Sequence, residues 1–450
     1  MPEGSASAAA VADRPGAGVL LRRILSLAAP TTLLAAVQSC AMLVETWLAA
    51  RQGTAALAGW AVVLPFALLI QQMSAGAMGG GVVSAIARAL GAGRREEASA
   101  LVVHALAIAL CGGMLFVVLL AVFPYTLLGL IGGPEAAATA APYAILLFGL
   151  GAIPTWLANT LASVLRGGGR HALSARVMLG TATAYPFLAW ALMEPAGMGL
   201  PGAGLAMAMT QTVAAVAQGV VVLAGGAGFR PTLRVRLQGA LFSRILSVGL
   251  VACMMAAISN LTTILVTARL AAHGAAAVAA YGVSARLEFL MIPLAFGVGS
   301  ALTALVGRAV GAGDWETARR TAWTGASLAL AVTGAVGLWV TLFPSATARA
   351  FASDPEVVTI ATTALSVVGP AMPAFGVGMA LYFASMGAGR MRWPVAAALA
   401  RIGLAVGGGW IATDLLGLGL TGQFVAVALG ITAYGVLCAS AVRAGVWGPR

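Results

Sequence analysis

The sequence predicts an all-α integral membrane protein whose twelve transmembrane helices form two parallel-repeat lobes of six helices each. Three observations carry this prediction: the composition, the placement of the arginines and an internal repeat. Of the 450 residues, 61% are hydrophobic and only 8% are charged, whereas soluble domains average about 25% charged residues. A soluble chain of this composition would lack the polar atoms to cover its surface, but a chain in a lipid bilayer does not need them.

The apolar runs are long enough to cross a bilayer, which takes about 20 helical residues for a hydrocarbon core about 30 Å thick. Runs without charges, or with one or two, give twelve spans. They are 24–49, 55–82, 99–124, 137–165, 172–193, 203–224, 242–268, 276–306, 317–343, 357–386, 392–412 and 420–442. The eleventh is the least regular, because Arg401 lies well inside it.

The arginines predict the orientation, because cytoplasmic connections carry an excess of basic residues. All 25 basic residues are arginines. With the N-terminus inside, all of them except Arg51, Arg269, Arg286 and Arg349 fall in inner segments. Both termini are therefore expected in the cytoplasm. Abundant Ala, Gly and Arg without Lys suggest a GC-rich bacterial genome, so the expected location is a bacterial inner membrane.

The two halves of the chain repeat each other at an offset of 220 to 221 residues. The segment 23–26 recurs at 244–247, and the glycine-containing loop 88–93 recurs at 308–313. Because each half holds an even number of spans, both halves enter the membrane in the same direction. Such parallel repeats are a recurring transporter design, with a substrate site between lobes that rock against each other.

The repeat also sets the predicted domain boundaries. We expect a disordered cytoplasmic tail over 1–22, because it consists mainly of small residues with few charges. An N-terminal six-helix lobe follows over 23–225, and a C-terminal six-helix lobe covers 244–446. The cytoplasmic linker 226–243 joins them and is first glycine-rich and then basic.

Several functional classes are excluded by composition and motifs. The net charge of +12 comes from dispersed arginines, and no basic helix is interleaved with aromatic residues, so nucleic acid is not an expected partner. The four cysteines lie in apolar runs without metal-ligand spacing, so no metal site is expected. Neither HExxH nor GxSxG occurs, so the chain is not expected to be an enzyme.

Glu45 is the main candidate for a functional residue, because an ionisable side chain inside a span is costly. Gln38 and Met42 lie at i−7 and i−3, on the same helix face, and are candidates for lining a cavity. Apolar surroundings disfavour the charged form of a carboxyl group, which suits reversible protonation. The alternative is that the helix ends early and leaves Glu45 at the membrane interface.

Glu288 is a second acidic residue inside a span. It shares a helix face with Tyr281 and Ser284, whereas Arg286, two residues away, points in another direction. Two interpretations stay open: a structural ion pair with another helix, or a substrate cavity lined by Tyr281 and Glu288.

Weaker polar stripes occur in other spans. Polar groups of membrane bundles mostly bond across helices, but each stripe is also a candidate for lining the cavity. The residues concerned are Gln71 in the second span, Asn159 in the fourth, Thr181 and Tyr185 in the fifth and Asn260 in the seventh.

Several segments, taken in order, resemble the multidrug and toxic compound extrusion (MATE) family over nearly the whole chain. They are Pro30, Val44-Glu45-Thr46, the turn 53–58, the loops 90–93 and 310–313, the segment 165–170 and Arg286-Leu287-Glu288. The resemblance implies twelve helices in two lobes. It also implies antiport of cationic or amphipathic compounds against protons or sodium.

The chain departs from the family pattern at positions that concern the coupling ion. The first span of the family usually carries Asp where Glu45 stands, and many members have Asn…Asp-Pro in helix 5, where this chain reads Thr181…Tyr185-Pro186. Some members also carry acids in helices 7 and 10, which this chain lacks. A sodium site needs several hard oxygen ligands, so we expect protons to act through Glu45, with Tyr185 and Thr181 beside it.

Together, these observations predict secondary active efflux of small organic, cationic and amphipathic compounds by antiport against protons or sodium, with alternating access between the lobes. The expected partners are the substrate and the lipid bilayer, the chain is expected to be a monomer, and no cofactor besides the coupling ion is expected. One alternative is a major-facilitator-type exporter, although 88–98 lacks that family's acid before the arginines. Another is a lipid-linked sugar flippase of the related superfamily, although the spans hold almost no arginine.

Overall fold

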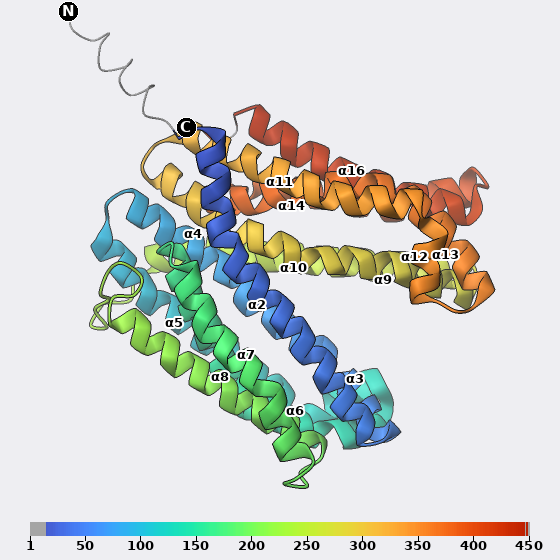
Figure 1. The fold of residues 1–450 in the computed structure, drawn as a ribbon, viewed down its shortest axis with the longest axis horizontal. Helices are drawn as coiled ribbons and strands as arrows, with labels where there is room; N and C mark the ends of the chain where they lie inside the picture. Colours follow the sequence, from blue (N-terminus) through green and yellow to red (C-terminus); the bar gives the residue numbers. More distant parts are fainter. Residues whose placement is uncertain (1–14, 446, 449–450) are drawn as a thin grey trace, which may run out of the picture. The chain divides into compact units, whose positions relative to one another are not determined.

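A computed structural model describes residues 15–445 and 447–448, which form helices joined by turns (Figure 1). Ten helices in this part of the chain are long and apolar enough to cross a membrane. The other two predicted spans, 172–193 and 276–306, are also helical. The predicted all-α membrane fold is thereby confirmed. Most of the predicted tail, 1–14, lies outside the described residues, and α2 (Ala17–Arg51) begins within the remainder of it.

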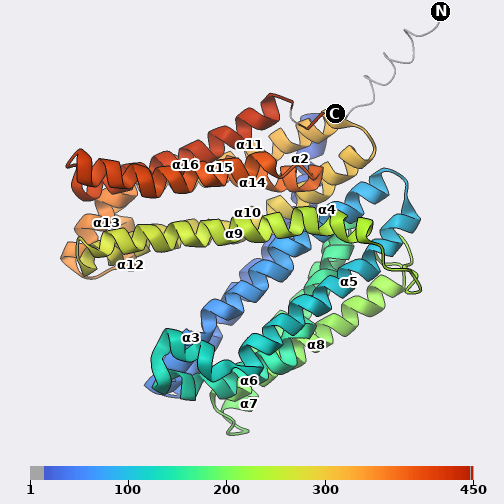
Figure 2. The same ribbon diagram turned by 180° about the vertical axis from the view of Figure 1, so that it is seen from behind.

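The chain divides into two compact units, of which the N-terminal unit holds Ala29–Cys253. After α2 and before the first part of α9 (Gly239–Ala271), its elements are α3 (Thr54–Gln71), the π-helix η1 (Gln72–Ala77), α4 (Met78–Gly91), α5 (Arg95–Val117), the π-helix η2 (Val118–Val122), α6 (Pro124–Gly167), α7 (His171–Met193) and α8 (Leu200–Leu223). The helix α6, which is interrupted by a kink at Gly133 (φ 79°), is central, because it packs against α3, α4, α5 and α8. The helices α5 to α8 lie side by side in both views (Figure 1 and Figure 2).

The C-terminal unit holds Met254–Arg450 together with the chain up to Ala28. Its described elements after α9 are α10 (Ala275–Gly311), α11 (Trp315–Leu342), α12 (Pro344–Phe351), α13 (Pro355–Val368), the 3-10 turn η3 (Gly369–Ala371), α14 (Met372–Ala388), α15 (Arg392–Ile402), the π-helices η4 (Gly403–Gly408) and η5 (Ile411–Leu415), and α16 (Gly419–Arg443). Here α14 is central, with α10, α11 and α16 packed around it. Each unit therefore has one central helix, α6 in the N-terminal unit and the 17-residue α14 in the C-terminal unit.

Equivalent turns of the two units share the same backbone conformation. Gly53 before α3 and Gly274 before α10 have φ angles of 105° and 103°, and Gly93 after α4 and Gly313 after α10 have φ angles of 74° and 78°. A residue with a Cβ is strained in this left-handed region. The repeated glycines of the sequence therefore mark repeated turns.

Small residues allow close helix packing in the N-terminal unit. A Cβ added to Gly81 of α4 would lie 2.8 Å from the backbone oxygen of Ile245 in the first part of α9. Close approach of backbones over small residues drives helix association where lipid removes the usual hydrophobic driving force. Gly81 therefore fixes the first part of α9 to the N-terminal unit.

The predicted linker 226–243 is attached to α5 by side chains of that helix. Ser99 accepts a hydrogen bond from the backbone N–H of Thr232 at 2.9 Å. Further along α5, Nε2 of the buried His104 accepts from the backbone N–H of Gln238, also at 2.9 Å. Glu97 pairs with Arg244 at the start of α9. The described linker is thus tied to the N-terminal unit along its length.

Candidate functional site

Glu45 lies on α2 close to the end of the helix, and it is only 7% exposed. Two donors from neighbouring helices reach its Oε1. The indole Nε1–H of Trp60 on α3 donates at 3.1 Å, and the hydroxyl of Tyr143 on α6 donates at 2.8 Å. Both bonds stabilise a charged carboxylate where burial opposes the charge. Oε2 remains the oxygen at which a proton can bind.

Tyr185 lies close to this carboxylate, on α7. The side chain is buried, and its hydroxyl interacts electrostatically with both Glu45 and Tyr143. The same hydroxyl is sealed from solvent and has no partner of good hydrogen-bond geometry among the described residues. A buried hydroxyl without a well-aligned partner is unusual, and the polar group within its reach is the Glu45 carboxylate, which a small movement would bring into good geometry.

The other residues predicted around Glu45 make different contacts. The hydroxyl of Thr181 donates to the carbonyl of Met178 in its own helix at 3.1 Å. Gln38 and Met42 are half-buried, and Met42 packs on the apolar core of the N-terminal unit. In the described part of the chain, none of these three predicted residues makes a hydrogen bond to Glu45.

Gln71 and Asn159, both predicted to line a cavity, are joined to each other. The amide Nδ2 of Asn159 on α6 donates to Oε1 of Gln71 at 2.6 Å and to the hydroxyl of Ser74 in η1 at 2.8 Å. One turn further along α6, Ser163 accepts from Arg166 at 2.7 Å. This chain of polar contacts follows the face of α6 that packs against η1 and α4.

In the C-terminal unit, Glu288 on α10 pairs with Arg401 on α15. Oε2 of Glu288 and Nη2 of Arg401 are 2.5 Å apart, and the two side chains are 14% and 13% exposed. The buried side chain of Tyr281 interacts electrostatically with both charges. Of the two interpretations left open for Glu288, the ion pair is present, and whether the pair and Tyr281 line a cavity stays a prediction. Asn260 on α9 is half-buried and donates to the carbonyl of Ala256 in its own helix at 2.9 Å.

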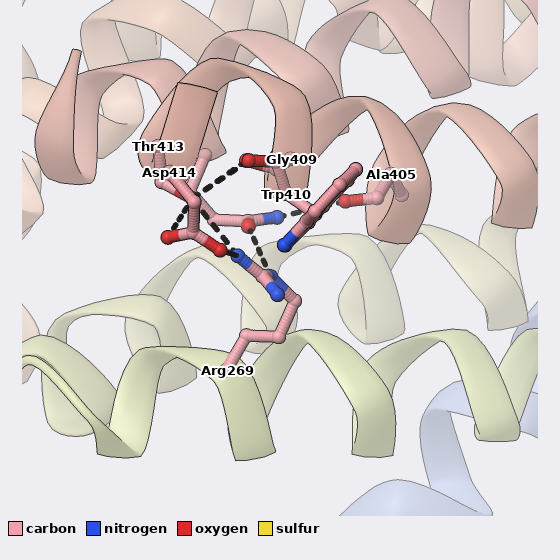
Figure 3. A network of polar contacts seen from close by, with 7 residues as sticks. Arg269, Ala405, Gly409, Trp410, Thr413 and Asp414 are labelled. Atoms are coloured by element: carbon pink, nitrogen blue, oxygen red, sulfur yellow. Dashed lines mark hydrogen bonds and ion pairs between the residues drawn. The ribbon is translucent and has the colours of Figure 1, made fainter. Parts of the chain in front are cut away.

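A polar network ties the end of α9 to η5 in the C-terminal unit (Figure 3). Nη2 of Arg269 donates to Thr413 at 2.8 Å and to Asp414 at 3.1 Å. Nε of the same arginine donates to Gln423 at 3.3 Å, and Gln423 in turn donates to the carbonyl of Ala405 at 2.8 Å. The network therefore connects α9, η4, η5 and α16 at one end of the unit.

A matching contact ties α2 to the end of α7 in the N-terminal unit. Nε of Arg51 donates to Glu194 at 2.7 Å, and Glu194 also accepts from the indole of Trp190 at 3.2 Å. The guanidinium of Arg51 lies 4.9 Å from the ring centre of Trp47. Glu194 precedes Asp414 by 220 residues, which is the offset of the internal repeat. We call Arg51–Glu194 and Arg269–Asp414 the end clasps.

Sequence reasoning missed Trp60 and Tyr143, and it noted Arg401 without its partner. Trp60 and Tyr143 sit inside spans and carry a polar tip, which needs a hydrogen-bond partner when buried. Arg401 also sits inside a span, where a charge pairs with another polar group. Each residue thus gave a signal that a partner exists, but the identity of that partner depends on which helices pack together.

Comparisons with known proteins agree with this architecture. The MatE family profile matches residues 30–190 and 249–411. A probable multidrug resistance protein NorM of Thermotoga maritima is 34% identical over 96 residues, which is 21% of this chain and 21% of that protein. The match thus spans about a fifth of the curated relative's length.

Solved structures of transporters have the same fold. A MOP superfamily transporter of Pyrococcus furiosus, for which a reversed polarity of the binding pocket suggests a different function, matches with a TM-score of 0.87 at 22% identity and covers 95% of this chain and 96% of its own. A MATE transporter of Vibrio cholerae, VcmN, matches with a TM-score of 0.87 at 20% identity and covers 96% and 98%.

The family assignment rests on the profile, which covers both halves of the chain at the places where the repeat was found. It also decides against the major-facilitator alternative. The chain therefore belongs to the MatE family, whose members are membrane transporters and not enzymes.

Proposed function

We propose that this transporter exports small organic compounds, cationic and amphipathic, across a bacterial inner membrane in exchange for protons. In this proposal the chain acts as a monomer, keeps both termini in the cytoplasm and alternates between inward and outward access. The excess of arginines in one set of connections supports the orientation. The family membership supports efflux as the transport process.

The observation that carries proton coupling is the pair of donors on Glu45. The hydroxyl of Tyr143 and the indole N–H of Trp60 both direct hydrogen atoms at Oε1. A tryptophan N–H is a donor only and cannot coordinate a cation, whereas sodium needs a shell of oxygen ligands. A proton needs a single oxygen, which Oε2 supplies. The surroundings of Glu45 therefore favour a proton over a sodium ion.

The proposed exchange follows from the charge of Glu45. In its ionised form the carboxylate attracts a cationic substrate, and in its protonated form it does not. Proton and substrate therefore weaken each other's binding, and by linkage the effect is reciprocal. The hydroxyl of Tyr185 lies within reach of Glu45 without a well-aligned hydrogen bond, and it is proposed to bond Glu45 directly or through a water molecule as the protonation state changes.

The experiment is substrate export from proteoliposomes under one imposed gradient at a time. A pH gradient at constant sodium is expected to drive export, and a sodium gradient at constant pH is not. Glu45→Gln mimics the protonated carboxyl and is expected to abolish driven export in a folded protein, whereas Glu45→Asp retains part of it. Glu135→Gln, an exposed acid on α6, is the matched control and should export normally. Export that follows sodium and ignores pH would overturn the proposal.

A further inference from the structure

The Glu288–Arg401 pair lies near the middle of the predicted membrane spans. Glu288 is 12 residues into the span 276–306, and Arg401 is 9 residues into the span 392–412. At about 1.5 Å per residue, the two side chains start roughly 18 Å and 14 Å from the respective ends of their spans. In a hydrocarbon core about 30 Å thick, both positions are close to the midplane.

The Glu288–Arg401 pair uses only part of its hydrogen-bonding capacity. One N–H of Arg401 meets one oxygen of Glu288, although a guanidinium offers five N–H donors. Neither side chain makes a second hydrogen bond among the described residues. The side chains of Arg401 and Glu288 are 13% and 14% exposed, so the pair is largely buried but not completely enclosed.

Contact between the polar atoms of this pair and lipid would be energetically unfavourable. Arginine inside a span faces the interior of the bundle or water, because unpaired N–H groups in hydrocarbon are costly. The ring of Phe375 on α14 lies 5.6 Å from the guanidinium carbon. Tyr434 on α16 adds a second aromatic side chain close enough to interact with the charge. The π-helix η4 begins two residues after Arg401, and π-helical turns are frequently found at functional sites.

We propose that Arg401 is a substrate-binding residue that recognises an anionic oxygen group, such as a carboxylate, on an amphipathic compound that also carries a cationic group. The free N–H groups of the guanidinium can bind a carboxylate through two parallel hydrogen bonds. The side chains of Phe375 and Tyr434 are buried beside the guanidinium, at 3% and 4% exposed, so they position Arg401 from within the helix packing. Glu288 acts as a positioning residue: it orients Arg401 and balances its charge while the subsite is empty. The inference rests on the proposed function, because it names the class of compound that is exported.

The test compares two probes that differ by one charge. Rhodamine B carries a delocalised cation and a carboxylate, and its ethyl ester carries the cation alone. Binding of each is measured by fluorescence polarisation to purified protein in nanodiscs at constant pH. Replacing both partners, Glu288→Gln with Arg401→Gln, keeps the site neutral. We expect about a tenfold loss of affinity for rhodamine B, as befits charge-assisted bonds, with the affinity for the ester changed less than twofold.

The controls separate a subsite from a structural role. Arg392→Gln removes an exposed arginine of the same helix, α15, and should leave both affinities unchanged. A structural role predicts equal losses for the two probes. Equal losses, unchanged rhodamine B binding, or no saturable binding of rhodamine B to the wild-type protein would each overturn the inference. Because binding needs no gradient, failure of proton-driven export would leave this result intact.

Discussion

The carboxyl group of Glu45 accepts hydrogen bonds from donors on α3 and α6. Such donors lower the free energy of the charged form and so oppose the effect of burial. A carboxyl group that exchanges a proton for a substrate in every cycle needs both protonation states to be accessible, and we expect these donors to make the charged state accessible. Trp60 and Tyr143 are therefore positioning residues in this account.

Tyr143→Phe tests this balance, because it removes one donor and nothing else from the side chain. Hydrogen bonds to charged groups contribute about 1.5–3 kcal/mol, and about 1.4 kcal/mol corresponds to one pH unit. Without the donor the protonated form of Glu45 is favoured, so export should require a more alkaline cytoplasm. We expect the pH profile of export to shift upward by about one unit. Tyr125→Phe, at an exposed tyrosine, should leave the profile in place, and a downward shift would contradict the account.

The end clasps are ion pairs that each join two helical elements within one unit. Each links the end of the first helix of a unit to the end of the fifth, and the helices they join in the N-terminal unit, α2 and α7, are those that carry Glu45 and Tyr185. Their side chains are partly exposed, at 52% and 25% for Arg51 and Glu194 and at 25% and 49% for Arg269 and Asp414. Exposed ion pairs contribute little to stability, so we expect each clasp to contribute only a small coupling free energy.

Double-mutant cycles measure the coupling free energy of each ion pair. Arg51→Gln and Glu194→Gln, singly and together, should give a coupling free energy of about 0.2–1 kcal/mol in thermal unfolding. Arg269→Gln and Asp414→Asn should give a larger value, because Arg269 is less exposed and has three side-chain partners. A coupling of zero in both cycles would mean that the clasps are incidental contacts.

His104 fixes the linker through one defined tautomer. Its Nδ1 lies 2.8 Å from the carbonyl of Ala100, which only an N–H can satisfy, so Nε2 is the acceptor for Gln238. His104→Ala removes this anchor and should raise the rate of tryptic cleavage after Arg234 and Arg236 several-fold. His273→Ala, at an exposed histidine of a turn in the C-terminal unit, is the matched control. Equal cleavage rates in the three proteins would show that the linker is held by other contacts.

At the scale of the whole molecule, the repeat made much of the fold predictable. The run lengths and the turn glycines indicate which segments form helices, because these features depend only on local sequence. The 220-residue offset indicates which turns are equivalent. The predicted spans coincide with helices throughout the described residues. The beginning of α2 at Ala17 was not expected, because small residues with few charges are compatible with either a helix or a tail.

The candidate site was predictable only in part. Glu45 and Glu288 were evident because a lone acid inside an apolar run is costly. Their partners were not, since the contacts of Glu45 with Tyr143 and of Glu288 with Arg401 join residues 98 and 113 positions apart. Which polar groups meet depends on the packing of helices distant in sequence, and periodicity within one helix does not contain that information.

The orientation of the whole molecule has a direct test. In a background without the four native cysteines, Ala92→Cys in the inner turn and Leu233→Cys in the linker should react with a membrane-impermeant maleimide only from the cytoplasmic side. Ala272→Cys, in the turn before α10, should react only from outside. All three positions are exposed, so accessibility does not differ for local reasons. Labelling of the linker from outside would reverse the assigned topology.

The central claim is that substrate and proton exclude each other at Glu45, and proton release measures this most directly. A cationic, amphipathic substrate is added to purified protein in weakly buffered detergent solution near the pH midpoint of export, and the pH is recorded. The account predicts release of a substantial fraction of one proton per bound substrate from the wild-type protein and none from Glu45→Gln. Binding without proton release in the wild-type protein, or equal release from Glu45→Gln, would contradict it.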